Sequence, residues 1–517
     1  MTSFNRRQFI QQAGAAAAAL SYRPSATAQV PHSKISDLPI DFGSDKNVFC
    51  DWRFIEAGYG LVSTSDVQKQ ARLGSFLMPR GVSLRVGRPM LSERPIIVAD
   101  TPTDGVYIGG YSTLLKDGGK FRLWYESYLT LKTGDAGAQI CYAESDDGLT
   151  WKKPNVGVFE YHGSRNNNVV FRHGHGASIF IDPTASISER YKMIHLDEVP
   201  LQMVNGKQMN SFVFGAVSRD GIHWKRLPQP LIKHTSDTQS VAEYDPITQK
   251  YVAYLRGWEP QTHAGYGGRR IVVRTESPEF GNFPEPVPVL SMGPQDPPDA
   301  DVYTNAYQRW PDARQAYLMT PAIYHRSSDH VDLQFATSRD GIRWQFPQRE
   351  PFISDGQPGS GYEGAIYAGR GTISIGKGTW AFPVSRYHGT HNTIVEELPV
   401  QPAQGSLWLA MLREDGYISL EAKDEGECWT QPAAFTGSRL LINSWGMSGS
   451  RVMIELADER GNPFPNFSLA DCDGLSGEHL WSPMTWRGNS NVGTLSGKLI
   501  RIRFGLHRAC LHAFRFS

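Results

Sequence analysis

The stretch "SRDGIHWKRLPQPLI" begins at Ser218, and the chain repeats it closely as "SRDGIRWQFPQREPFI" from Ser338. A looser copy, "SDDGLTWKKPNVGVFEY", begins at Ser145. Each copy contains the phrase S-x-D-G-x-x-W, in which Asp-Gly is typical of a tight turn between two antiparallel strands. The serine and the aspartate can accept hydrogen bonds from nearby backbone N–H groups, and the tryptophan offers a large apolar surface for packing between sheets. The phrase therefore predicts a structural turn that marks one unit of a repeated scaffold.

The spacing of the phrase indicates how many units there are. Its tryptophans are Trp151, Trp224 and Trp344, which lie 73 and 120 residues apart. The second interval is close to two units of about sixty residues, so a degenerate copy is expected midway. The stretch "IVVRTESPEFGNFPEPVPVL" from Ile271 fits, because it keeps the strand, the serine and the proline-bearing run but lacks the Asp-Gly and the tryptophan. With a much altered copy in "SLWLAMLREDG" from Ser406, the sequence predicts five units.

A unit of this length, with about four strands, cannot bury both of its faces alone. Such units, stacked radially, close into a β-propeller that has few open edges. The sequence therefore predicts an all-β protein with a five-bladed β-propeller over residues 101–425. Beyond residue 425 the phrase disappears, and the alternation of Ile500, Ile502 and Phe504 predicts a C-terminal β-sandwich over residues 426–517. Residues 29–100 are expected to form a leader that packs on the propeller, with "VFCDWRFIEAGYGLV" crossing a blade edge.

The overall charge excludes some classes of partner. Lysine and arginine number 52, as do aspartate and glutamate, so the formal net charge is zero. Because the chain also lacks a block of like charge, we expect neither nucleic acid nor an anionic membrane as its main partner. The sequence does not predict an oligomeric state.

The first 28 residues resemble a bacterial twin-arginine export signal. The stretch "NRRQFIQQAGAAAAALSYRPSATA" pairs Arg6 with Arg7, continues with an alanine-rich apolar run and ends at Ala28. The resemblance implies cleavage after Ala28 and a periplasmic or secreted protein, which N-terminal sequencing of the mature protein would test. No later apolar run approaches the roughly 20 residues of a membrane span. We therefore expect no membrane span after processing.

The cysteines are expected to be mostly buried free thiols. The chain has five, and no pair has the C-x-x-C spacing of a zinc or redox motif. The resemblance to the export signal implies that the protein folds before export, which does not favour a disulfide framework. The cysteines are Cys50, Cys141, Cys428, Cys472 and Cys510.

The five units, followed by the closing strands "GKLIRIRFGLHRACLHAFRFS" from Gly497, resemble the five-bladed β-propeller glycosidases of the invertase, fructanase and arabinanase kind. The leader segment "CDWRFIE" is also similar to that of bacterial exported glycosidase-like proteins. The resemblance covers the chain from about residue 45 to its end, although the N-D-P-N-G, arginine-aspartate-proline and glutamate-cysteine motifs of the family are missing. It implies an exported glycoside hydrolase that acts on an oligo- or polysaccharide without a redox cofactor. Six-bladed sialidases, whose S-x-D-x-G-x-x-W turn is one residue longer, are a weaker match.

Glycoside cleavage needs two carboxyl groups, one protonated and one ionised, on either side of the scissile bond. In a propeller the first strand of each unit begins at the central channel, so acids just before these strands can meet there. Three acids have this position: Asp237, Asp301 and Glu363. We predict that they form the catalytic set, with Glu363 as the general acid by analogy with the family. Asp299 is a rival to Asp301, and each acid could instead cap a turn.

Other polar and aromatic residues at comparable positions of the units are candidates for substrate binding, because aromatic faces and arginine donors suit a carbohydrate. His173 and His175 are expected on one strand face, where they could bind a sugar, pack, or share a metal ion. We predict no catalytic metal and no cofactor, although a structural calcium ion remains compatible with the sequence. Asp104 accompanies Tyr107 at the start of the first unit. The predicted substrate-binding residues are Tyr107, His173, His175, Arg256, His325, Arg386 and His388.

The same sequence features also fit two other functions. A propeller with the same pocket but without productive acids would bind carbohydrate and not cleave it. A glycoside phosphorylase would need a cluster of arginine and histidine to hold phosphate. The visible candidates for that cluster are His325, Arg326, Arg386 and His388.

Overall fold

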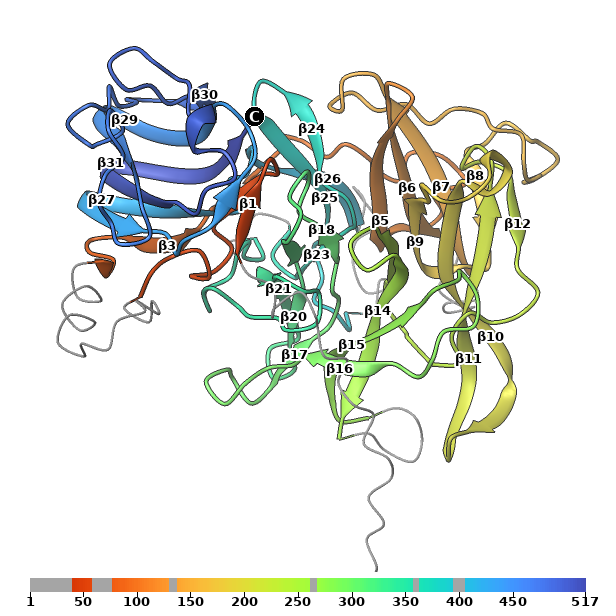
Figure 1. Ribbon diagram of the computed structural model, residues 1–517. Helices are drawn as coiled ribbons and strands as arrows, with labels where there is room; N and C mark the ends of the chain where they lie inside the picture. Colours follow the sequence, from red (N-terminus) through yellow and green to blue (C-terminus); the bar gives the residue numbers. More distant parts are fainter. Residues whose placement is uncertain (1–39, 58–76, 130–136, 261–266, 357–361, 394–404) are drawn as a thin grey trace, which may run out of the picture. The chain divides into compact units, whose positions relative to one another are not determined.

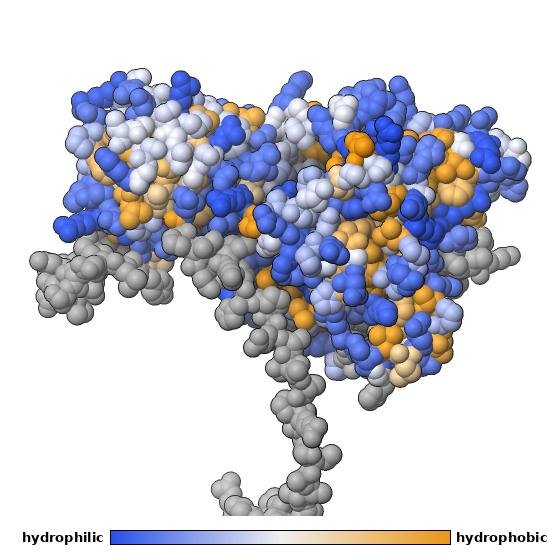
Figure 2. Space-filling view, turned by 45° about the vertical axis from the view of Figure 1, so that its right-hand side comes forward, coloured by the Kyte–Doolittle hydropathy of each residue, from blue (hydrophilic) through white to orange (hydrophobic). Residues whose placement is uncertain are grey.

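The computed structural model describes residues 40–57, 77–129, 137–260, 267–356, 362–393 and 405–517. These residues form β-strands with two short 3-10 helices, Ile187–Glu189 and Gly493–Leu495 (Figure 1). The predicted export signal, and the part of the leader stretch beyond residue 57, lie outside the described residues. No helix of the described ranges is long and apolar enough to cross a membrane. The face shown in Figure 2 is mostly hydrophilic, with hydrophobic residues in scattered patches.

Three sheets of four antiparallel strands follow one another in chain order. The first contains β5 (Tyr107–Asp117), β6 (Lys120–Tyr128), β7 (Ala138–Ser145) and β8 (Val169–Arg172). The second contains β9 (His175–Ile181), β10 (Tyr191–Val204), β11 (Lys207–Ser218) and β12 (Trp224–Arg226). The third contains β13 (Val241–Asp245), β14 (Lys250–Glu259), β15 (Arg269–Ser277) and β16 (Val287–Leu290).

The next two predicted units are less regular, because their strands are shared between two sheets. A three-stranded sheet contains β18 (Gln308–Arg309), β19 (Tyr317–Met319) and β22 (Ala336–Ser338). A larger sheet begins with β17 (Ala300–Val302), β20 (Ala322–His325) and β21 (His330–Leu333). It continues with β23 (Ala365–Ala368), β24 (Ile373–Gly376), β25 (Thr379–Tyr387), β26 (Gly405–Arg413) and β4 (Met90–Leu91). The parallel pairing of β21 with β23 connects the two units.

Backbone hydrogen bonds join the first sheet to the last. The N–H of Leu114 donates to the carbonyl of Arg370 at 2.8 Å, and the N–H of Arg370 donates to the carbonyl of Ser112 at 2.8 Å. Between these ends, β5 contacts β9, β9 contacts β13, and β15 contacts β17. The arrangement is therefore propeller-like, with the first strands of the first three sheets, β5, β9 and β13, side by side.

The repeated phrase forms the turn that the sequence predicts. In the second copy, Ser218 Oγ accepts the N–H of Gly221 at 2.9 Å, and Asp220 Oδ1 accepts the N–H of Ile222 at 2.9 Å. The Trp224 indole N–H donates to the Gly221 carbonyl at 3.1 Å. Equivalent contacts recur in the copies that begin at residues 145 and 338. The phrase is therefore a structural turn, as predicted.

The turn glycine also explains how neighbouring sheets pack. Gly221 has φ of 78°, which a glycine adopts without strain. Its carbonyl accepts a second hydrogen bond, at 2.7 Å, from the Trp124 indole of the preceding sheet. A Cβ at Gly221 would lie 2.7 Å from the Trp124 ring, so a larger residue would separate the two sheets.

The C-terminal sheet has long central strands and receives strands from the leader. It contains, in order, β3 (Ser83–Val86), β27 (Ile418–Trp429), β31 (Arg501–Phe516), β29 (Leu440–Ala457) and β30 (His479–Pro483), with β2 (Asn47–Val48) beside β31. A separate parallel pair joins β1 (Asp41–Gly43) to β28 (Ala434–Phe435). Ile500, Ile502 and Phe504 are fully buried in one cluster, as their alternation predicts. β27 crosses residue 425, so the long strands of this sheet begin where the last unit ends.

The leader lies between the fourth unit and the C-terminal sheet. The carbonyl of Cys50 accepts a hydrogen bond from Thr337 at 2.9 Å, and Arg339 donates to the carbonyl of Val48 at 2.8 Å. Further along the leader, β4 pairs with β26 and supplies an outer strand of the last unit. The leader is therefore an integral part of both sheets that it contacts. All five cysteines are free, and four of them are buried.

Buried histidines predict how stability depends on pH. His195 on β10 lies against the Phe171 ring at 4.9 Å, and burial lowers its pKa to about 3. Between pH 6.5 and about 3 the unfolded chain therefore binds one more proton at this site, and stability falls as pH falls, by about 1.4 kcal/mol per pH unit. We expect His195→Phe to flatten the slope of unfolding free energy between pH 6 and pH 4 by that amount, measured by urea unfolding.

The matched control is His162→Asn, because His162 is exposed and asparagine tolerates its φ of 49°. This control should keep the wild-type slope. An unchanged slope in His195→Phe would contradict the assignment of a neutral buried imidazole.

Candidate functional site

The first strands of the sheets line a pocket of about 220 Å³. Its wall is dominated by tyrosines from several units. Tyr107 and Tyr111 belong to β5, Tyr367 belongs to β23, and Tyr303 follows β17 directly. Second strands add Tyr128 of β6 and Tyr387 of β25, and the remaining polar lining residues are Glu126, His175, Asp237, Thr390, His391 and Thr393.

The tyrosine rings are fixed by contacts with one another. Tyr107 and Tyr128 are opposite residues in the β5–β6 pairing, and their rings stack at 4.7 Å with 3° between the planes. The Tyr387 ring packs edge-on against Tyr107 at 6.3 Å and against Tyr367 at 5.7 Å. Tyr303 contacts Tyr367 at 6.0 Å. The rings therefore form one connected aromatic wall.

A chain of polar groups connects the wall of the first sheet to that of the third. Glu126 Oε1 accepts the Tyr128 hydroxyl at 2.5 Å and lies 3.0 Å from His175 Nδ1, while Glu126 Oε2 accepts the N–H of Gly176 at 2.8 Å. On the other side of the imidazole, His175 Nε2 lies 3.5 Å from Asp237 Oδ1. The Glu126 side chain is only 1 % exposed. Glu126 therefore orients His175, and His175 contacts Asp237.

Asp237 is an ionised acid of the pocket. Burial raises the pKa of Asp237, but the hydrogen bond with His175 and the charge of Arg256 outweigh burial and lower the pKa to about 2. Arg256 Nη1 lies 3.2 Å from Asp237 Oδ2, and the guanidinium packs 4.0 Å from the centre of the Tyr303 ring. The side chain of Asp237 is 45 % exposed and that of Arg256 is 1 % exposed. The carboxylate therefore faces the pocket, and the arginine lies behind it.

His391, in the loop after β25, adds an uncharged imidazole to the lining of the pocket. Its Nδ1 lies 2.7 Å from the Tyr367 hydroxyl, and its ring contacts Tyr303 at 4.5 Å. Burial, together with the charges of Arg256 and Arg270, lowers the pKa of His391 to about 4. At neutral pH the imidazole is therefore a neutral hydrogen-bonding group.

The structure brings only some of the predicted acids to the pocket. Asp237 lines it, whereas Asp301 does not. Asp301 is buried, with Oδ2 at 2.8 Å from Arg270 Nη1 and 2.8 Å from Arg326 Nη2. Its rival Asp299 accepts hydrogen bonds from the side chain and backbone of Ser327, outside the lining.

Glu363 lies just before β23, as the sequence predicts, but is not a lining residue itself. The next residue, Gly364, packs directly on the pocket wall. A Cβ at Gly364 would lie 1.8 Å from the carbonyl oxygen of Gly389, which is a lining residue. The backbone beside Glu363 is therefore in contact with the wall.

Only some of the predicted binding residues line the pocket. Tyr107 and His175 line the pocket. Arg256 does not line it but pairs with Asp237, which does. His173 is exposed, has φ of 53° and lies outside the strands, so it does not share a strand face with His175. In the described ranges, no three His, Cys, Asp or Glu residues gather as a metal site.

The other three predicted binding residues lie outside the lining. His325 Nε2 pairs with Asp332 Oδ2 at 2.9 Å. Arg386 and His388 both pack on the Tyr362 ring, at 4.7 Å and 4.9 Å. Arg386 and His388 therefore share one aromatic partner, whereas His325 pairs with an acid.

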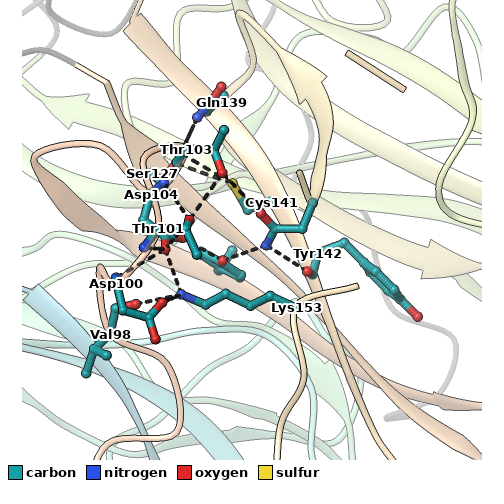
Figure 3. Close-up of polar contacts among 12 residues, drawn as sticks. Val98, Asp100, Thr101, Thr103, Asp104, Ser127, Gln139, Cys141, Tyr142 and Lys153 are labelled. Carbon is teal, nitrogen blue, oxygen red and sulfur yellow. Dashed lines mark hydrogen bonds and ion pairs between the residues drawn. The ribbon is translucent and has the colours of Figure 1, made fainter. Parts of the chain in front are cut away.

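Asp104 belongs to a buried network and not to the pocket. Figure 3 shows Lys153 between Asp100 and Asp104, with Lys153 Nζ 2.7 Å from Asp104 Oδ2. The other oxygen of Asp104 accepts the hydroxyl of Tyr125 at 2.8 Å. Because Tyr125 precedes Glu126 on β6, this network fixes the strand that carries Glu126.

Several wall residues were not predicted, although a signal for some of them exists in the sequence. Tyr111, Tyr303 and Tyr367 all lie on or beside the first strand of their units, so a recurring tyrosine marks the wall. Glu126 gives no comparable signal, because it lies on a second strand that carries other polar residues as well.

Comparison with known proteins shows similarity in fold at low sequence identity. No family model and no curated protein matches this chain. Among solved structures, the chain is similar to five-bladed β-propeller glycosidases. One is the Bombyx mori GH32 β-fructofuranosidase (TM-score 0.41, 9 % identity, covering 82 % of this chain and 94 % of that chain). A thermostable family-43 glycoside hydrolase has a TM-score of 0.41 and 13 % identity, covering 63 % of this chain and 95 % of that chain. An N-acetylgalactosamine deacetylase from F. plautii, in complex with blood group B trisaccharide, has a TM-score of 0.43 and 14 % identity, covering 64 % of this chain and 96 % of that chain.

Proposed function

We propose that this protein is a glycoside hydrolase whose active site is the tyrosine-walled pocket. The observation that carries the proposal is the ionised, part-exposed carboxylate of Asp237 at a wall of tyrosine rings. Aromatic faces pack on the C–H groups of sugars, while tyrosine hydroxyls and imidazoles bond to sugar hydroxyls. An ionised carboxylate is one of the two groups that glycoside cleavage requires.

We also propose that the five units form a five-bladed β-propeller, with the C-terminal sheet as part of a β-sandwich. The hydrogen bonds between Arg370 and the strand residues Ser112 and Leu114 support closure of the ring. Closure explains how Tyr107 of the first unit and Tyr387 of the last unit come to contact each other.

In the proposed mechanism Asp237 is the nucleophile or the base, because its low pKa keeps it ionised near neutral pH. Glu363 is the proposed general acid, on the support that its neighbour Gly364 contacts the wall. Asp301 has a positioning role. It pairs with Arg270, whose guanidinium lies 5.1 Å from the centre of the Tyr303 ring.

Binding of a carbohydrate without cleavage is the second candidate function, and one observation favours it. Of the two acids that line the described pocket, Glu126 is buried beneath His175, so Asp237 is the accessible one. A pocket with a single accessible acid would bind a sugar without cleaving it. The phosphorylase alternative is less favoured, because Arg326 pairs with Asp301 and His325 pairs with Asp332.

The test is to incubate the mature protein with a panel of plant and algal polysaccharides and to measure new reducing ends. The same panel is then tested for binding by affinity electrophoresis. New reducing ends support the hydrolase. Binding without any reducing ends, across the polysaccharides that are bound, would favour the non-catalytic function.

A further inference from the structure

We propose that the pocket is closed at its inner end and accepts a single terminal sugar residue that carries no carboxylate, and that Asp329 holds one of its side walls in place. This inference deepens the proposed function and rests on it for the view that the bound sugar is a substrate. It would also hold for a protein that only binds the sugar. It rests on the size of the pocket, its closed inner end, the attachment of one wall and the charge of its lining.

The pocket is small. Its volume of about 220 Å³ lies below the roughly 300–1,000 Å³ of sites that hold drug-sized molecules. A second cavity, of about 690 Å³, is lined by Leu114–Lys116, Glu243, Arg309 and Arg370. Leu114–Lys116 lie beyond Tyr111 on β5, Glu243 lies on β13, which Asp237 precedes, and Arg370 follows β23, which carries Tyr367. The two cavities therefore lie toward opposite ends of the same strands.

Buried side chains separate the two cavities. Gln239 Nε2 donates to the carbonyl of Ser112 at 2.9 Å and to the carbonyl of Ala177 at 3.0 Å, which joins three units. Both acceptors belong to first strands, β5 and β9. Gln239 is 1 % exposed. A chain of sugars therefore cannot pass along the axis, and the inner end of the pocket is closed.

One side wall is a loop that a neighbouring unit holds in place. The 388–393 loop contributes Gly389, Thr390, His391 and Thr393 to the lining. Asp329, in the turn between β20 and β21, accepts the N–H of His391 on its carbonyl at 2.9 Å. Its carboxylate accepts the N–H and the side-chain amide of Asn392 at 2.8 Å and 2.6 Å. Asp329 therefore fixes the loop, and with it the position of His391.

The lining is selective in charge. The acids among the described lining residues are Asp237 and Glu126, His175 lies between them, and His391 is neutral at pH 7. No arginine or lysine is among the described lining residues: Arg256 is buried behind Asp237, and Arg270, whose side chain is 24 % exposed, pairs with Asp301. A carboxylate on the bound sugar would therefore face Asp237, with no arginine or lysine in the described lining to compensate it.

The first experiment measures binding alone, by titration calorimetry or saturation-transfer NMR at pH 7. The probes are methyl glycosides of common hexoses and pentoses, with methyl glucuronide and galacturonide matched to the glucoside and galactoside. We expect at least one uncharged glycoside to bind, and the uronide matched to a binding hexoside to bind about tenfold less tightly or not at all. In Asp237→Asn this difference should shrink. Tighter or equal binding of a uronide, or no binding of any monosaccharide, would overturn the inference.

The second experiment tests whether Asp329 holds the 388–393 loop in the position that binding requires. Asp329→Gly removes the carboxylate, and glycine tolerates the φ of 62° at this position. We expect the affinity for the preferred glycoside to fall by about tenfold. Asp312→Gly is the matched control, because Asp312 is an exposed turn residue with φ of 60° that lines the other cavity. Equal affinities of the two variants would overturn the role of Asp329.

Product analysis tests the same inference wherever hydrolysis is detected. Release of monosaccharide from one end of the chain is expected, and a ladder of internal fragments would contradict a pocket closed at its inner end. If no hydrolysis occurs but monosaccharides bind as described, the proposed enzyme fails while the inferred pocket stands.

Discussion

Asp237→Asn is expected to lower kcat/KM by about 10²–10⁴-fold on the polysaccharide that the wild-type protein hydrolyses. The amide keeps the shape of the side chain and an acceptor for His175, but it cannot act as a nucleophile or a base. Because the carboxylate is 45 % exposed, the melting temperature should change by only a few degrees. Initial rates and thermal unfolding of the same preparation check both statements.

Replacing Glu363, the proposed general acid, should also slow hydrolysis. Glu363→Gln should slow hydrolysis of substrates with poor leaving groups by a similar factor, and should slow activated aryl glycosides less, because these need little protonation to depart. Asp299→Asn is the control, since Asp299 lies outside the pocket and bonds to Ser327. Full activity of Asp237→Asn would exclude the site. Full activity of Glu363→Gln alone would exclude only the acid.

The pH profile follows from the same electrostatics. The pKa of Asp237 is about 2, so its ionisation contributes no loss of kcat/KM between pH 7 and pH 4. A fall in activity in that range would have to come from another group or from unfolding of the chain. The buried histidines, with pKa values near 3, lower the free energy of unfolding over the same range.

The repeated phrase made the units predictable because it depends on local chemistry. Asp220 bonds to N–H groups two and three residues further along, and Trp224 bonds to a carbonyl three residues before it. Such contacts need only the right residues at the right spacing, and they recur in all three copies. The alternation at Ile500 and Ile502 is local in the same sense.

The candidate site was less predictable because it depends on which way side chains point. Asp237 and Asp301 are both predicted at the start of a first strand, and no local pattern favours one over the other. In the structure Asp237 meets His175 from the preceding unit, whereas Asp301 meets Arg270 on β15. These partners are 62 and 31 residues away in the chain. A difference of this kind follows from the packing of neighbouring sheets, which no local pattern records.

The role of the leader was also hidden in the sequence. Lys46 lies between β1 and β2, and nothing around it indicates a buried charge. In the structure its Nζ lies 3.0 Å from Asp415 Oδ1, in the turn before β27, and the two side chains are 3 % and 0 % exposed. The same carboxylate accepts hydrogen bonds from Trp310 at 2.9 Å and from Asn443 at 3.1 Å. This cluster joins the leader, the fourth unit, the last unit and the C-terminal sheet.

Lys46→Met is therefore expected to lower the free energy of unfolding by about 3–5 kcal/mol, because it leaves the buried Asp415 carboxylate without its cation. Burial raises the pKa of Asp415, and loss of the lysine should raise it further. The folded state then binds the proton more tightly than the unfolded state, so the variant should recover stability as pH falls toward 5. Urea unfolding at pH 7 and pH 5 measures both effects.

The double variant Lys46→Met/Asp415→Asn separates the charge from the packing. Asparagine tolerates the φ of 60° at residue 415 and keeps one acceptor for Trp310, while methionine keeps the contact with the Trp380 ring, which lies 4.9 Å from the lysine nitrogen. Replacing both charges by neutral groups of similar size should therefore restore most of the lost stability. If Lys46→Met costs less than about 1 kcal/mol, or if the double variant is as unstable as the single one, the ion pair is not what joins the leader to the two sheets.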